Sequence, residues 1–166
     1  VEKVGYFPAS STGGINFGWP TFEGTRCNVD VVTAEECDAQ EAGVAFPIKE
    51  YLREFGSSVT GGSVYRGTEI PGLQGRYIYA DYVSARVLSF VPVNGVATAE
   101  REYSLDLDPE DEILSGLVAV SEDGVGELYL VSIFGNIFKL VAGLGDDAQQ
   151  FGPTEGEEEL PEAAAL

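Results

Sequence analysis

The segment GRYIYAD at residues 75–81, followed by ARVLSFV at residues 85–91, returns as GELYLVS (126–132) and GNIFKLV (135–141). Each pair joins two short apolar and β-branched runs through a turn, which is typical of a β-hairpin. The copies are offset by 51 residues at the opening glycines (126 minus 75) and by 50 residues at the second strands (137 minus 87). A repeat of about 50 residues built from short strands is typical of the blades of a β-propeller.

The neighbouring segments extend this all-β pattern. Further strands are predicted over residues 1–7, 15–22, 63–66 and 117–120, and Asn94-Gly95 predicts a two-residue hairpin turn. Residues 23–43 are predicted to be irregular, and residues 46–55 fit either an extended segment or a short helix. We therefore expect about two four-stranded antiparallel blades, plus extra strands of a partial β-propeller, over residues 1–142. Because propellers close with about four to eight blades, we expect the chain to be part of a larger protein.

The composition changes after Val141. The chain has 28 Asp and Glu against 9 Lys and Arg, a net charge of −19, and seven of these acids lie in residues 143–166, which contain no Lys or Arg. These residues also contain few apolar side chains, and burying so few cannot offset the entropy lost on ordering the chain. Residues 143–166 are therefore predicted to be a disordered acidic tail.

The charge and the hydropathy also exclude several classes of partner. An acidic surface repels nucleic acid and anionic membranes, because binding either one depends on clustered cations. The sequence has no run of about 20 apolar residues that would span a bilayer and no signal-peptide pattern at Val1. We therefore predict no nucleic acid partner and no membrane insertion.

The chain contains two cysteines, Cys27 and Cys37, and no histidine. The cysteines either close a short disulfide loop, which indicates an oxidising compartment, or remain two free thiols. A zinc site normally takes four Cys or His ligands, so none is predicted. Without His, the commonest general base and the nucleophilic triads are missing.

Few other residues indicate chemistry. Arg66 and Arg86 lie at hairpins and could hold an anionic cofactor through forked donors, or could pair with the abundant acids. The acidic run at residues 106–112 offers oxygen ligands but lacks the glycine and the final glutamate of an EF-hand loop, so we expect a solvated loop. Glu2 could be a metal ligand only with partners upstream of Val1.

Three stretches resemble the glucose/sorbosone dehydrogenase family. The stretch TGGINFGWPTFEGTRC at residues 12–27 is similar to its Gly-Trp-Pro motif, and residues 58–67 with 70–84 (SVTGGSVYRG and IPGLQGRYIYADYVS) are similar to its next motif. Glu122-Asp123 and GELY at residues 126–129 resemble its last motif. Together these stretches span residues 1 to about 142.

The resemblance implies a six-bladed β-propeller, periplasmic or extracellular, whose soluble aldose dehydrogenase members bind pyrroloquinoline quinone and calcium. In such members the quinone takes a hydride from the sugar C1, a histidine takes the hydroxyl proton, and electrons pass to an external acceptor. The resemblance also implies that Cys27 pairs with Cys37, and it makes Thr60 and Arg86 the candidate quinone-binding residues. The catalytic histidine lies before the Gly-Trp-Pro motif in that family, and the arginine pair that its quinone-binding members carry is missing near residues 113–115.

The sequence thus leads to two functional hypotheses, beside a third in which the chain is a purely structural module whose acidic tail links it to a cell surface or to a further domain. In the first, the chain is the C-terminal part of a quinone-dependent aldose sugar dehydrogenase, inactive alone, whose partners are a sugar, an electron acceptor and the remaining blades. In the second, it belongs to a secreted propeller without enzymatic activity that binds a glycan or a protein.

Overall fold

The computed structural model describes residues 1–108 and 113–143, and it confirms the all-β prediction. Its strands form four antiparallel sheets, and none of them closes into a barrel within those two ranges. The tail predicted over residues 143–166 lies outside the described residues except for Gly143.

The central sheet has four strands in the order β5-β6-β7-β8, and the next has three in the order β11-β10-β9. The strands of the first are β5 (Val59–Val64), β6 (Tyr77–Asp81), β7 (Val87–Val93) and β8 (Val96–Glu102). Those of the second are β9 (Leu117–Glu122), β10 (Leu128–Ser132) and β11 (Ile137–Lys139). We call the β5–β8 sheet the first unit and the β9–β11 sheet the second unit. The first unit has the four strands expected of a blade, whereas the second has three strands in the part of the chain that is described.

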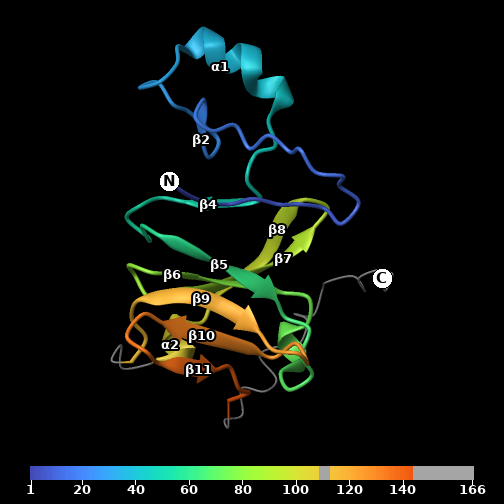
Figure 1. Ribbon diagram of the computed structural model, residues 1–166, viewed down its shortest axis with the longest axis vertical. Coiled ribbons are helices and arrows are strands. Elements are labelled where there is room, and N and C mark those ends of the chain that lie inside the picture. Colours follow the sequence, from blue (N-terminus) through green and yellow to red (C-terminus); the bar gives the residue numbers. More distant parts are fainter. Residues whose placement is uncertain (109–112, 144–166) are drawn as a thin grey trace.

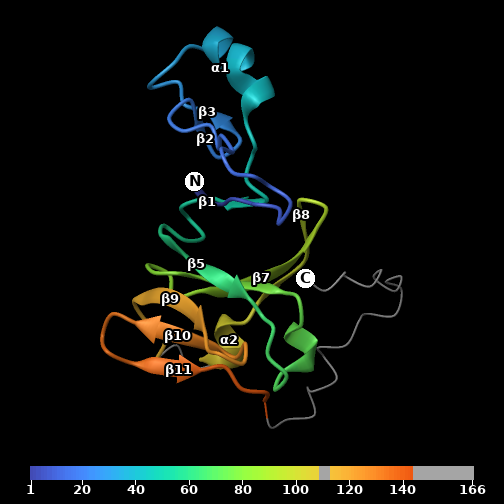
Figure 2. The ribbon, with the colours of Figure 1, turned by 45° about the vertical axis from the view of Figure 1, so that its right-hand side comes forward.

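The sheets stack face to face in layers, with β5 beside β9 (Figures 1 and 2). A core of thirteen buried residues fills the space between the four-stranded and three-stranded sheets; among them Ile78, Val87, Leu117 and Leu128 are fully buried. A third layer, β1 (Glu2–Val4) paired with β4 (Lys49–Tyr51), covers the other face of the central sheet. Its core is much smaller, with only Val4, Tyr79 and Phe90 buried.

The N-terminal third departs most from the sequence expectations. The strand predicted over residues 1–7 is only β1, and the strand predicted over residues 15–22 is reduced to β2 (Phe22–Glu23), which pairs with β3 (Arg26–Cys27). Gly18 explains the second difference, because its positive φ of 84° turns the backbone away from an extended path. Residues 46–55, which fitted strand or helix, contain strand β4.

The segment predicted to be irregular, residues 23–43, contains helix α1 (Ala34–Gln40), followed by a 3-10 turn, Glu41–Gly43. Thr33 begins the helix in a capping box: its hydroxyl accepts from the Glu36 N–H, while the Glu36 carboxylate accepts from the Thr33 N–H. The prediction overlooked this Thr-x-x-Glu pattern. Elsewhere helix is scarce, as expected, with α2 (Ser104–Leu107) and a 3-10 turn at Pro71–Leu73.

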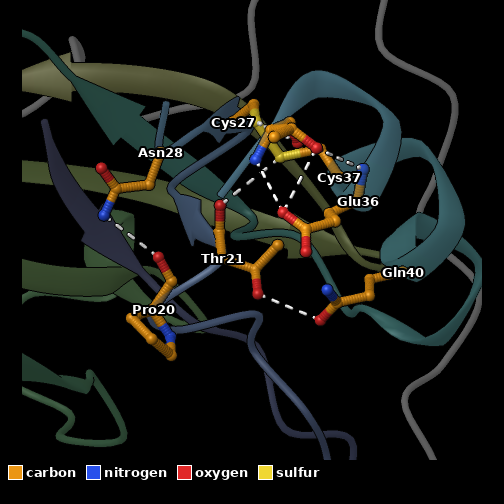
Figure 3. Close-up of a disulfide and its surroundings, with 8 residues drawn as sticks. Pro20, Thr21, Cys27, Asn28, Glu36, Cys37 and Gln40 are labelled. Atoms are coloured by element: carbon orange, nitrogen blue, oxygen red, sulfur yellow. Dashed lines mark hydrogen bonds between the residues drawn. A yellow bond between two sulfur atoms is a disulfide. The ribbon is translucent and has the colours of Figure 1, made fainter. Parts of the chain in front are cut away.

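A disulfide joins Cys27 of β3 to Cys37 of α1, with the two Cα atoms 5.9 Å apart (Figure 3). It confirms the pairing that the family resemblance implies. The Thr21 hydroxyl donates to Gln40 Oε1 at 3.0 Å and the Asn28 amide donates to the Pro20 carbonyl at 3.1 Å, so further contacts attach the helix and its loop to the residues before them. A disulfide is consistent with a periplasmic or extracellular protein.

The described parts of the chain contain no helix with the length and apolar character needed to cross a membrane.

Candidate functional site

An open cavity of about 350 Å³ lies between strand β4 and the face of the four-stranded sheet. Its lining mixes aromatic rings with charged side chains: Lys49, Glu50, Tyr51, Leu52, Phe55, Tyr79, Arg86, Leu88 and Glu100. Lys49 and Glu100 form an ion pair of 2.5 Å from opposite walls, which fastens β4 to β8. Three residues were predicted to bind ligands: Glu2, Thr60 and Arg86. Only Arg86 is among the residues that line this cavity.

Arg86 precedes strand β7 and uses its forked guanidinium within the protein. Its Nε donates to Glu102 Oε1 at 2.9 Å, its Nη2 donates to the other carboxylate oxygen, and its Nη1 donates to the Phe55 carbonyl at 2.8 Å. The hydrogen bond to Glu102 raises the pKa of Arg86 and also lowers the pKa of Glu102. The sequence left two roles open for Arg86, which were binding an anionic cofactor and pairing with an acidic residue. In the structure it pairs with an acidic residue. The same holds for Arg66, whose Nη1 lies 3.4 Å from Glu122.

Glu2 and Thr60 also bond to the protein itself. Glu2 Oε2 accepts from the Val59 N–H at 2.9 Å, and its other oxygen lies 4.0 Å from Arg53. The Thr60 hydroxyl donates to the Ala80 carbonyl at 3.2 Å. Glu2 on β1 thus contacts the residue that precedes Thr60 on β5, whereas Arg86 contacts Phe55 and Glu102.

Glu2, Thr60 and Arg86 are each held by hydrogen bonds to other protein groups. Residues 1–108 and 113–143 contain no group of three or more Asp, Glu, Cys or His side chains that could hold a metal ion. In the acidic run considered for calcium, Asp106 pairs with Arg101 at 3.2 Å, and residues 109–112 lie outside the described residues. A cofactor that binds through Glu2, Thr60 or Arg86 would therefore meet side chains that already hydrogen-bond to protein groups.

The Gly-Trp-Pro segment packs against the β1–β4 layer. Trp19 is 66% exposed, and the Lys3 ammonium lies 5.5 Å from the centroid of its ring. No protein-family model matches this chain. Trp19 presents an exposed aromatic surface on this layer.

Asp81 is a buried carboxylate that the sequence analysis did not single out. Its Oδ2 accepts from the Tyr51 hydroxyl at 2.9 Å and from the Ser58 N–H at 2.8 Å. Its Oδ1 accepts from the N–H groups of Val83 and Ser84 and from the Ser84 hydroxyl. One side chain thus holds the β6–β7 turn, the start of β5 and the β1–β4 layer together. An aspartate that ends an apolar strand before a turn is the sequence signal for such a residue.

Glu127 holds a second junction in a similar way. It is 2% exposed, and it accepts from the Tyr65 hydroxyl at 2.8 Å and from the N–H groups of Thr68 and Glu69 at 2.7 and 3.0 Å. A Cβ added to Gly67 would lie only 2.4 Å from its carboxyl carbon, so a larger residue there would have to displace the carboxylate. Glu127 therefore fixes the 65–70 loop of the first unit onto the second, and its role is structural.

Acidic pH is expected to destabilise the fold through these carboxylates. Burial alone would raise the pKa of Asp81, but the hydrogen bonds from Ser84, Ser58 and Tyr51 outweigh burial and lower it. The pKa of Glu102 is also lowered, chiefly by Arg86. Groups whose folded pKa lies below the unfolded value of about 3.9 (Asp) or 4.3 (Glu) stabilise the fold in full above that value. They lose this contribution as the pH falls through the folded pKa.

Urea unfolding between pH 7 and pH 3 checks this expectation: the midpoint should stay level near neutrality and fall below about pH 4. In Asp81→Asn the fall should be shallower. An unfolding midpoint that rises as the pH falls through this window would contradict the assignment.

Proposed function

We propose that this chain supplies C-terminal blades to a propeller of the quinone-dependent aldose sugar dehydrogenase type, in which other blades carry the reactive centre. The complete protein would oxidise the C1 hydroxyl of a sugar to the lactone and pass electrons to an external acceptor. Its partners are then the sugar, the acceptor and the remaining blades. Pyrroloquinoline quinone and calcium would be cofactors of that complete protein.

The observation that carries the proposal is an uncovered face on the second unit. In the first unit Ile78, Ala80 and Val87 face the next sheet and are fully buried. Their counterparts in the repeat, Tyr129, Val131 and Ile137, face away from the first unit; the two β10 residues are half-buried and Ile137 is 67% exposed. The same apolar face is thus buried where a further sheet follows, and on the second sheet it is open among the residues that the structure describes. A further sheet stacked on it is what a propeller requires.

Three other features agree with the proposal. The sequence motifs at residues 12–27 and 58–84 resemble the dehydrogenase family, and the disulfide is consistent with the periplasmic or extracellular location that we propose. The net charge of −19 leaves nucleic acid and anionic membranes unfavourable as partners.

The chain alone is expected to be catalytically silent. It contains no histidine to take the hydroxyl proton, and Arg86 and Glu2 are engaged by protein groups. A dye-coupled assay with glucose, added quinone and Ca²⁺ should give the rate of a blank without protein. Turnover above that blank would contradict the assignment of the reactive centre to other blades.

The enzymatic proposal itself is tested on the complete gene product, loaded with quinone and Ca²⁺ and assayed on a panel of aldoses. Dye reduction that depends on both additions would support it. Failure on every sugar would refute it.

A propeller without enzymatic activity, which binds a glycan or a protein, is the second candidate. The engagement of Arg86 by Glu102 and Phe55 favours it, because three of the five guanidinium donors of the predicted quinone ligand already bind protein groups. Binding on a glycan array by a complete product that does not turn over any aldose would support this alternative.

A further inference from the structure

Strand β11 occupies the place in the second unit that β7 occupies in the first. Pairings of Cα atoms between β6 and β7 recur between β10 and β11. The residue number rises by 51 from β6 to β10 and by 50 from β7 to β11. The matching pairs are Ile78↔Ser89 with Tyr129↔Lys139, Tyr79↔Leu88 with Leu130↔Phe138, and Ala80↔Val87 with Val131↔Ile137. The two units therefore share one register, and not only a similar sequence.

The equivalent strands differ at their second edge. β7 pairs on that side with β8, which completes a four-stranded sheet, and beyond β8 the Tyr103 N–H donates to the Val87 carbonyl at 2.8 Å. Within residues 1–108 and 113–143, β11 pairs with β10 and with no other strand. An edge strand presents a row of backbone N–H and C=O groups that a further strand can pair with.

We propose that the outer edge of β11, Ile137–Lys139, binds an extended strand that runs antiparallel to it, in the position that β8 holds against β7. The bound segment is a separate strand rich in β-branched and aromatic residues. Residues 144–166 suit this role poorly by composition, since they contain no Val, Ile, Tyr or Trp.

The first unit specifies the chemistry of the bound strand. Arg101 of β8 lies opposite Ser89, whereas the equivalent position on β11 is Lys139, so a cation there would face a cation. The incoming strand therefore carries a neutral or acidic residue opposite Lys139. Near Ile137 it carries a large apolar residue, as Tyr103 lies against Val87. The inference depends on the shared register and not on sugar oxidation, so it can fail or succeed independently of the proposed function.

The test inserts a second copy of residues 92–104 directly after Val141, which corresponds to Val91 in the repeat, and keeps residues 142–166 behind it. The inserted copy carries Arg101→Thr, and a matched control insert also carries Thr98→Pro and Glu100→Pro, which cannot complete a ladder. Tethering gives the strand a high effective concentration at the edge. Hydrogen exchange resolved to single residues reports the amides of Ile137, Lys139 and Val141, which alternate along the strand with the Leu140 N–H that donates to Leu128 and so face away from β10. The amides of β10 verify that both variants fold.

We expect the strand insert to slow exchange at these three outward-facing amides at least about tenfold relative to the proline control, since ladder amides exchange only on opening. Equal exchange in the two folded variants would overturn the proposal. Protection of these amides in the unmodified chain would also overturn it. If that protection is independent of protein concentration, the C-terminal residues cover the edge; if it grows with concentration, a second copy does.

Discussion

Replacing Asp81 with asparagine is expected to lower the free energy of unfolding by about 3–5 kcal/mol, because hydrogen bonds to a buried charged acceptor are worth about 1.5–3 kcal/mol each. The carboxylate accepts on both oxygens from five donors, and an amide can accept on one oxygen only. Its NH₂ group would face N–H donors whichever way it turned. Chemical denaturation monitored by circular dichroism measures the loss.

The position of Asp81 also predicts where the damage appears. Tyr51 belongs to β4, so the loss of its partner weakens the attachment of the β1–β4 layer, whose core is small. Asp30→Asn, in an exposed loop, is the matched control and should leave stability within about 0.5 kcal/mol of the parent chain. A loss in Asp81→Asn no larger than in this control would show that the network does not stabilise the junction.

The second large effect is expected from Tyr65→Phe, which removes one oxygen atom and leaves the ring in place. The Tyr65 hydroxyl is fully buried; it donates to Glu127 Oε2 at 2.8 Å and accepts from the Ile70 N–H at 2.7 Å. The variant leaves two buried polar groups without that partner, one of them charged, which should cost about 2–4 kcal/mol. Thermal and urea unfolding at neutral pH measure this cost.

Tyr82→Phe provides the control for Tyr65→Phe, because Tyr82 is 37% exposed in the β6–β7 turn. It should be nearly neutral. Gly67→Ala should lower stability as well, since the added methyl group would meet the Glu127 carboxylate. If Tyr65→Phe were neutral while Gly67→Ala was destabilising, Glu127 would be held by the loop N–H groups without need of the tyrosine.

Most of the sheet structure could be predicted from the sequence, and the reason is its alternation. Strands β6, β7, β10 and β11 lie where the repeated segments predict them, and Asn94 and Gly95 both take the positive φ expected of their hairpin turn. Helix α1 was missed because its polar, acidic sequence resembles a loop, and only its capping box indicates a helix. The order of the layers follows from contacts between distant residues, which no local pattern contains.

The site residues were harder to predict for a physical reason. The sequence shows that Arg86 can bind an anion, but whether the anion is a cofactor or Glu102 depends on what the end of β8 places beside it. Asp81 and Glu127 looked like two of many surface acids. Their importance comes from burial and from the backbone donors around them, which appear only when the units are stacked.

The two equivalent turns differ in length although the strands that they join keep one register. Residues 82–86 connect β6 to β7, whereas the shorter segment 133–136 connects β10 to β11. The first turn takes up its additional residue with Ala85 in a left-handed conformation, at a φ of 55°. This rim of the molecule therefore tolerates insertions without a shift in strand pairing. Evolution or an engineer could graft new loops there and change what the rim recognises while the sheets beneath remain as they are.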